Sequence, residues 1–202
     1  MPTLVESPPK LYSPAEYLAL EEKSEQRNEY LDGVIIPMTG GSLIHNQIII
    51  NLCTFLRIAL KPNKGKVFAS DLRVWIPETR RYTYPDVLVI HDEPQFYENR
   101  TDTILNPVLI IEVLSQSTSD YDRGDKFKAY RSIPSFREYW LVKQSELQVE
   151  QYCKTDDETW LYRTYENPQA TLRSPILNLE MTIQDIYEDV DFKPLPTDEH
   201  SK

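Results

Sequence analysis

Two strongly apolar segments of this chain each contain one acidic residue. Asp86 lies in the segment Tyr-Pro-Asp-Val-Leu-Val-Ile (84–90), and Glu112 lies in the segment Val-Leu-Ile-Ile-Glu-Val-Leu (108–114). Runs this rich in Val, Ile and Leu are typical of strands that are buried on both faces. Because an isolated buried charge is too costly, each carboxylate must be neutralised, paired or bound to a cation. The two acids, with a lysine-bearing segment after the second, indicate a metal site.

The length and composition predict one folded domain. A chain of 202 residues with 40% hydrophobic and 11% aromatic residues can bury a core without disulfides. Cys53 and Cys153 form no CxxC pair, which argues against a zinc site built from cysteines. We read no apolar run of bilayer length and no signal peptide at the first residues. We therefore expect a cytoplasmic protein with no membrane partner.

The charge distribution restricts how nucleic acid could bind. A net charge of −10 weighs against binding through the whole surface, because phosphate contacts need cations. Lysine and arginine are nevertheless concentrated in two stretches, 61–81 and 123–131. A basic cleft is therefore compatible with the acidic net charge.

The pattern along the chain predicts a mixed α/β domain over residues 13–190, between flexible tails at 1–12 and 191–202. Ser13, Pro14 and Glu16 form a helix-start signature with a capping box, for a helix to about Lys23. Asp32-Gly33 is favoured in a tight hairpin turn. The expected elements are helices at 13–23, 43–60, about 118–131 and 182–187, hairpins at 28–31/34–38 and 147–152/159–165, and strands at 66–69, 71–76, 85–90, 107–114 and 137–142.

Asp86, Glu112 and Lys126 are a residue set suited to phosphodiester hydrolysis. Two carboxylates with neighbouring carbonyl oxygens can hold a hard divalent ion such as Mg²⁺. Such an ion binds phosphate, activates water and stabilises the leaving group, and a nearby ammonium complements it. The set therefore predicts a divalent-metal-dependent hydrolase.

The sequence resembles the Uma-type restriction endonuclease family, within the PD-(D/E)XK nuclease superfamily. The resemblance rests on the opening helix at 13–18, the hairpin at 29–38, and His45 in the helix that follows. It continues through Tyr-Pro-Asp (84–86), Glu-Val-Leu-Ser (112–115), Asp-Arg-Gly-Asp-Lys (122–126), Tyr130 and the strand 138–142. It implies a restriction-endonuclease-like core, a mixed sheet flanked by helices.

The resemblance also implies site roles. Asp86 and Glu112 would bind Mg²⁺ or Mn²⁺, Lys126 would assist the attacking water, and Glu29 would complete the site, with His45 contacting substrate. One departure is that the superfamily pattern places a lysine where this chain has Leu114. Lys126 is therefore the candidate lysine, carried on the next helix, with Lys128 as the alternative.

Structural roles remain alternatives for each residue. Asp86 could be satisfied by backbone donors, Glu112 could pair with Arg73, and Lys126 could form a surface pair with Asp122. Tyr130 reads more readily as a core residue than as a catalytic one. For the whole chain we expect a nuclease acting on nucleic acid, with DNA as the substrate and a homodimer as the assembly. The rival functions are a nucleic-acid-binding module that cuts poorly and a protein-interaction domain with a structural cation.

Overall fold

The computed structural model describes residues 10–115, 119–156 and 158–192. Its larger sheet has six strands in the order β11-β10-β9-β8-β6-β3. Only β8 and β9 pair in parallel; the other neighbours in this sheet are antiparallel. The strands are β3 (Lys66–Ala69), β6 (Val87–Ile90), β8 (Leu109–Leu114), β9 (Glu138–Lys143), β10 (Val149–Lys154) and β11 (Trp160–Tyr165).

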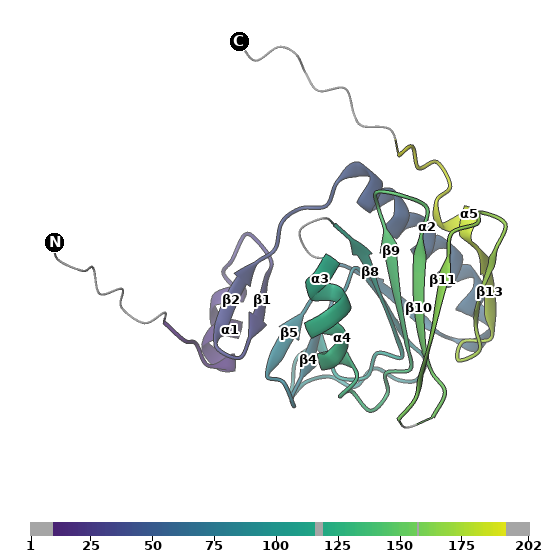
Figure 1. The fold of residues 1–202 in the computed structure, drawn as a ribbon. Coiled ribbons are helices and arrows are strands. Elements are labelled where there is room, and N and C mark those ends of the chain that lie inside the picture. Colours follow the sequence, from purple (N-terminus) through teal and green to yellow (C-terminus); the bar gives the residue numbers. More distant parts are fainter. Residues whose placement is uncertain (1–9, 116–118, 157, 193–202) are drawn as a thin grey trace, which may run out of the picture.

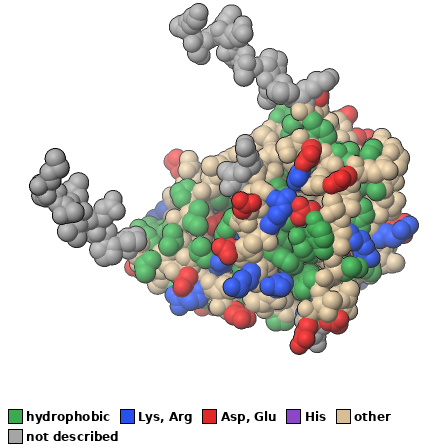
Figure 2. Space-filling model, viewed as in Figure 1, with side chains coloured by type: hydrophobic (Ala, Val, Ile, Leu, Met, Phe, Trp, Pro, Cys, Tyr) green, Lys and Arg blue, Asp and Glu red, His purple; other side chains and the backbone are tan. Residues whose placement is uncertain are grey.

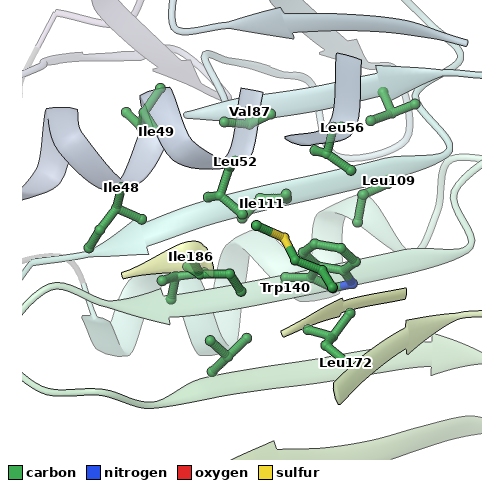
Figure 3. Packing of buried hydrophobic residues seen from close by; sticks show 14 of the residues in the cluster. Ile48, Ile49, Leu52, Leu56, Val87, Leu109, Ile111, Trp140, Leu172 and Ile186 are labelled. Atoms are coloured by element: carbon green, nitrogen blue, oxygen red, sulfur yellow. The ribbon is translucent and has the colours of Figure 1, made fainter. Parts of the chain in front are cut away.

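A helical layer covers each face of this sheet (Figure 1). On one face, α2 (Leu43–Leu60) buries Ile48, Leu52 and Leu56 against Ile111 and Trp140, as Figure 3 shows. On the other face lie α3 (Ser119–Tyr121), a π-helical turn η2 (Asp122–Lys126) and α4 (Phe127–Tyr130). β6 and β8 are buried at every position, as their apolar sequences predict. Sheet and helices together form a mixed α/β fold in which a central mixed sheet is flanked by helices, as predicted.

A second sheet lies beside the first and carries the N-terminal hairpin. It has five strands in the order β2-β1-β5-β4-β7, and α1 packs its Tyr17 and Leu18 against it. The hairpin turn is formed by Asp32 and Gly33, both at positive φ. The elements are α1 (Pro14–Glu21), β1 (Asn28–Leu31), β2 (Val34–Pro37), β4 (Arg73–Ile76), β5 (Arg81–Thr83) and β7 (Thr103–Ile104).

The C-terminal part closes over the α2 side of the larger sheet. β12 (Thr171–Ser174) and β13 (Leu179–Thr182) form a two-stranded sheet, and α5 (Ile183–Ile186) follows with a capping box at Thr182. Leu172 and Ile186 join the core beneath α2 (Figure 3). A short 3-10 helix, η1 (Lys61–Asn63), ends α2.

The element boundaries agree with the sequence patterns where the periodicity is long. The helix at 43–60 and the strand at 66–69 are confirmed at both ends. The strand expected at 71–76 starts only at Arg73, since Ser70 has positive φ and turns the chain. The short strands β5, β7, β12 and β13 were not predicted. The helix expected at about 118–131 contains a π-helical turn, and its expected first residue, 118, lies outside the described residues.

Helix α2 requires a correction to the expectation that no segment could span a bilayer. Residues Leu43–Asn63 are long and apolar enough by length and composition, the one such helix in the part of the chain that the structure describes. Length and composition are weak evidence alone, because core helices pass the same test. The inner face of α2 packs against the sheet, while Ile50 and Ile58 on its outer face are 58% and 71% exposed.

The proposed tails lie mostly outside the described residues, which begin at Lys10 and end at Phe192. At the inner ends of these segments, the Tyr12 N–H donates to the carbonyl of Gly33, and Phe192 packs against the ring of Tyr187. Both cysteines are free thiols.

Candidate active site

Asp86 and Glu112 lie opposite each other on adjacent antiparallel strands. The register pairs Val87 with Ile111, which places Asp86, one residue before β6, beside Glu112 in β8. Oδ2 of Asp86 accepts a hydrogen bond of 2.7 Å from the Val113 N–H, and the Asp86 N–H lies 3.4 Å from Oε2 of Glu112. Asp86 is less buried than predicted, because the ladder of β6 begins only after it. Its carboxylate therefore reaches an open cleft.

Lys126 contacts three carboxylates at once. Its Nζ lies 3.1 Å from Oε1 of Glu29, 3.3 Å from Oε1 of Glu112 and 3.3 Å from Oδ1 of Asp122. The Lys126 side chain is 8% exposed, so its pair with Asp122 is not the surface pair considered from sequence. Lys128, the alternative lysine, is exposed and does not line the cleft. Glu112 does not pair with Arg73, which instead pairs with Asp102.

The buried charges shift each other's protonation. Burial raises the pKa of Glu112, the Lys126 ammonium opposes this, and Asp122, Asp86 and Glu29 raise the pKa further. For Lys126, burial acts to lower the pKa, but the carboxylates of Glu112, Glu29 and Asp122 outweigh it and hold the pKa above its ordinary value. The cluster therefore keeps its ammonium and holds an excess of carboxylates.

Tyr130 fixes one oxygen of Glu112. Its hydroxyl lies 2.9 Å from Oε1 of Glu112, to which it donates, and 3.1 Å from the hydroxyl of Thr83. The tyrosine is fully buried, and this burial raises the pKa of its hydroxyl. With Tyr130 and Lys126 both on Oε1, Oε2 of Glu112 is left facing Asp86.

His45 reaches Asp86 from the first turn of α2. Its Nε2 lies 3.2 Å from Oδ1 of Asp86, and Ser42 caps the helix by accepting from the His45 N–H. A Cβ on Gly41 would lie 2.3 Å from Cδ2 of His45, so only glycine leaves this ring its place. Burial acts to lower the pKa of His45, and the contact with Asp86, supported by the Val113 backbone and Asp122, raises it above its ordinary value.

Two residues of the site were missed from sequence. Asp122 is 3% exposed, and its Oδ1 accepts no hydrogen bond from the described residues although it lies beside Lys126. Tyr130 was read as a core residue. Both could have been found from their spacing, because positions 122, 126 and 130 repeat every four residues and share one helix face.

A family model described as "Putative restriction endonuclease" (Uma2) matches residues 14–184 of the chain. The chain belongs to this family. It is 42% identical over 152 residues to "Uncharacterized protein sll1609" of Synechocystis sp., covering 75% of this chain and 86% of the relative. It is 38% identical over 185 residues to "Uncharacterized protein slr1290" of the same organism, covering 91% of this chain and 95% of the relative.

A solved structure supports the fold of this Uma2-family chain. The crystal structure of a nuclease of family DUF820 from Anabaena variabilis, itself described as "putative", superposes with a TM-score of 0.70 at 23% identity. The match covers 89% of this chain and 98% of that one. The resemblance expected from sequence is thus confirmed at the level of family and fold, and the family description is that of a restriction-endonuclease-like nuclease.

The residues of this Uma2 site suit a hard divalent ion bound mainly through water. The described residues hold no group of three or more His, Cys, Asp or Glu side chains arranged to enclose a metal. Mg²⁺ commonly uses one or two carboxylates and keeps several waters. Asp86 and Glu112 border the same cleft of about 290 Å³, where the carboxylates of Glu29 and Asp122 outnumber the single ammonium of Lys126 and also favour a cation. The donor set therefore fits Mg²⁺ or Mn²⁺.

Proposed function

We propose that this protein is a divalent-metal-dependent nuclease that hydrolyses phosphodiester bonds in DNA. The observation that carries the proposal is the convergence of Glu29, Asp86, Glu112 and Lys126 on one cleft. These four residues come from β1, the start of β6, β8 and the π-helical turn, so they are far apart in sequence. A buried cluster of carboxylates around one lysine is costly for a purely structural role.

Asp86 and Glu112 would hold Mg²⁺ or Mn²⁺. The ion, when bound, would supply a Lewis acid for a phosphate oxygen and lower the pKa of bound water. The Val113 N–H and His45 orient the carboxylate of Asp86. Tyr130 and Lys126 orient Glu112 through its Oε1. Each candidate ligand thus has a hydrogen-bonding partner that fixes its direction, as is usual around protein metal sites.

Lys126 would supply the positive charge of the reaction. Its ammonium stays charged among three carboxylates, and it lines the cleft beside Glu112. A lysine in this position can orient an attacking water and stabilise negative charge that develops on the phosphate. Its helical origin replaces the strand lysine that the superfamily pattern would place at Leu114, a buried apolar residue.

A nucleic-acid-binding module that cuts poorly is the second candidate. It is favoured by the same lysine, because three carboxylate contacts leave Lys126 less free to act on substrate. The net charge of −10 does not distinguish the two candidates, because phosphate contacts need cations in either case. Figure 2 shows the face of the molecule seen in Figure 1, where Lys and Arg side chains are scattered among Asp and Glu without forming a continuous basic patch.

Cleavage of plasmid and single-stranded DNA with Mg²⁺ or Mn²⁺ separates the two candidates. We expect the wild type to cut and Asp86→Asn to be inactive, while Asp92→Asn, an exposed aspartate outside the cleft, cuts normally. DNA that is bound but left intact by the wild type would favour the binding module. Equal cleavage by wild type and Asp86→Asn would contradict the proposed site.

The metal claim has a separate test in thermal stability. A ligand that binds only the folded state raises the melting temperature by mass action. Added Mn²⁺ should raise the melting temperature of the wild type and leave that of Glu112→Gln unmoved. An equal shift in both proteins would contradict a metal site at Glu112.

The assembly and the cellular location are part of the same proposal. A homodimer suits a cut in both strands of a duplex, because its two-fold axis can match that of the DNA. We also propose a cytoplasmic location, where DNA would be the partner. Light scattering of the purified chain, with and without duplex DNA, measures the assembly directly.

A further inference from the structure

The cleft continues past Asp86 into a second lobe. This outer lobe, of about 380 Å³, is bordered by Arg27, Ser70, Asp71 and Asn46, residues that do not line the inner lobe at the carboxylate cluster. The two lobes share the loop 38–41 together with His45, Tyr84 and Asp86. Asp86 therefore lies where the lobes meet, with open space on both sides.

Two glycines lie where the lobes meet. Gly40 and Gly41 border both lobes, and a Cβ on Gly40 would meet no atom within 4 Å. No side chain of this pair therefore projects between the lobes. A chain-like ligand could pass from one lobe to the other across Asp86, whereas a compact ligand would need only one of them.

Arg27 is the cation of the outer lobe. Among the described residues that line the two lobes, the lysines and arginines are Lys126, which is buried and held by three carboxylates, and Arg27. The Arg27 side chain is 47% exposed, and its guanidinium lies over the ring of Tyr84, 5.7 Å from the centroid. Its backbone carbonyl accepts from the Met38 N–H, which extends the β1–β2 hairpin and anchors the residue.

The present partner of Arg27 is weakly held. Nε of Arg27 lies 3.2 Å from Oδ1 of Asp71, whose side chain is 78% exposed. Asp71 follows Ser70, a residue at positive φ whose N–H donates to the carbonyl of Asp86. Exposed ion pairs of this kind contribute little to stability. A phosphate, which accepts hydrogen bonds from arginine in the same geometry as a carboxylate, can therefore replace Asp71.

We propose that the outer lobe binds the nucleic-acid strand next to the bond that is cut, and that Arg27 binds a phosphate of that strand in place of Asp71. This inference rests on the proposed nuclease function and adds the path of the substrate. Because the other face of Arg27 is supported by Tyr84, the guanidinium can keep its position when its partner changes.

The proposal is tested by measuring the affinity for a fluorescently labelled single-stranded DNA oligonucleotide. The measurement is made with Ca²⁺ and over a range of KCl concentrations. We expect Arg27→Gln to weaken binding about tenfold, since a charge-assisted phosphate contact is lost. The slope of log affinity against log salt should fall by about 0.7, the value for one phosphate contact on a single strand. Asp71→Asn should tighten binding by up to about fivefold.

Arg80 and Asp32 form the matched control. They too make an exposed arginine–aspartate pair, at 2.8 Å, but line neither lobe. Arg80→Gln and Asp32→Asn should leave affinity and salt slope near the wild-type values. If Arg27→Gln behaves like Arg80→Gln, or Asp71→Asn like Asp32→Asn, the path through the outer lobe is wrong while the nuclease proposal stands. If the wild type binds no oligonucleotide, both the outer-lobe proposal and the nuclease proposal are wrong.

Discussion

Nζ of Lys126 lies 3.3 Å from Oε1 of Glu112, the same oxygen that receives the hydroxyl of Tyr130. One helical face thus supplies both groups that orient a carboxylate in the middle of a sheet. Residues 122 and 126 of this face lie on the π-helical turn, where the chain departs from regular α-helix, and residue 130 lies on α4. Single π-helical turns of this kind are frequent at functional sites.

Replacing Lys126 by alanine should destabilise the metal-free protein. It leaves Glu29, Glu112 and Asp122 buried without their cation, and breaking a buried pair in this way costs about 3–5 kcal/mol. Urea unfolding in EDTA measures the loss. Cleavage should also be abolished. Lys128→Ala, at an exposed position, should change the free energy of unfolding by less than about 0.5 kcal/mol and leave cleavage intact. If Lys128→Ala abolished cleavage and Lys126→Ala did not, Lys128 would be the catalytic lysine.

Tyr130→Phe should weaken metal binding without removing a ligand. Loss of the hydroxyl frees Oε1 of Glu112 to reorient, and removal of such an orienting partner typically costs 10–100-fold in metal affinity. Calorimetric titration with Mn²⁺ measures the change. Tyr187→Phe removes another buried tyrosine hydroxyl, one that bonds the backbone of Lys143 and Gln148, and should leave Mn²⁺ affinity unchanged. Equal Mn²⁺ affinity in wild type and Tyr130→Phe would make Tyr130 only a core residue.

Glu112 should make the metal-free protein lose stability as the pH rises. Because its pKa in the folded state is raised above the ordinary value of 4.5, the folded state binds more protons than the unfolded state from about that pH upward. The free energy of unfolding therefore falls with pH over this window, until the carboxyl is ionised in both states. Glu112→Gln removes this contribution. The wild type minus Glu112→Gln difference, measured in EDTA, should decline as the pH rises above about 4.5; a flat or rising difference would contradict it.

Gly41→Ala should displace His45 from Asp86. The added Cβ would lie 2.3 Å from Cδ2 of the ring, whereas Gly40→Ala adds its Cβ in open space. Since the contact with Asp86 raises the pKa of His45 against the effect of burial, we expect a lower His45 pKa in Gly41→Ala and an unchanged one in Gly40→Ala. An NMR titration of the ring resonances measures both. A common pKa in all three proteins would show that Gly41 does not hold the ring in place.

Much of the fold was predictable because local patterns and packing agree. Three local patterns each favour one structure: the apolar periodicity of α2, the Asp32-Gly33 turn, and the apolar runs of the buried strands β6 and β8. The short strands β5 and β7 escaped prediction because they contain three and two residues. They are strands only because neighbouring strands pair with them. A sequence of two or three residues is too short to show a pattern that would predict pairing with a distant segment.

The sequence by itself determined that Asp86 and Glu112 lie in or beside buried strands, where the cost of desolvating a charge demands partners. Only the tertiary structure decided which partners they have. Glu29, Asp122 and Tyr130 join the cluster because a hairpin and a π-helical turn, far apart along the chain, pack against the same two strands. Distances between distant segments follow from packing, and packing depends on the whole core rather than on any local pattern.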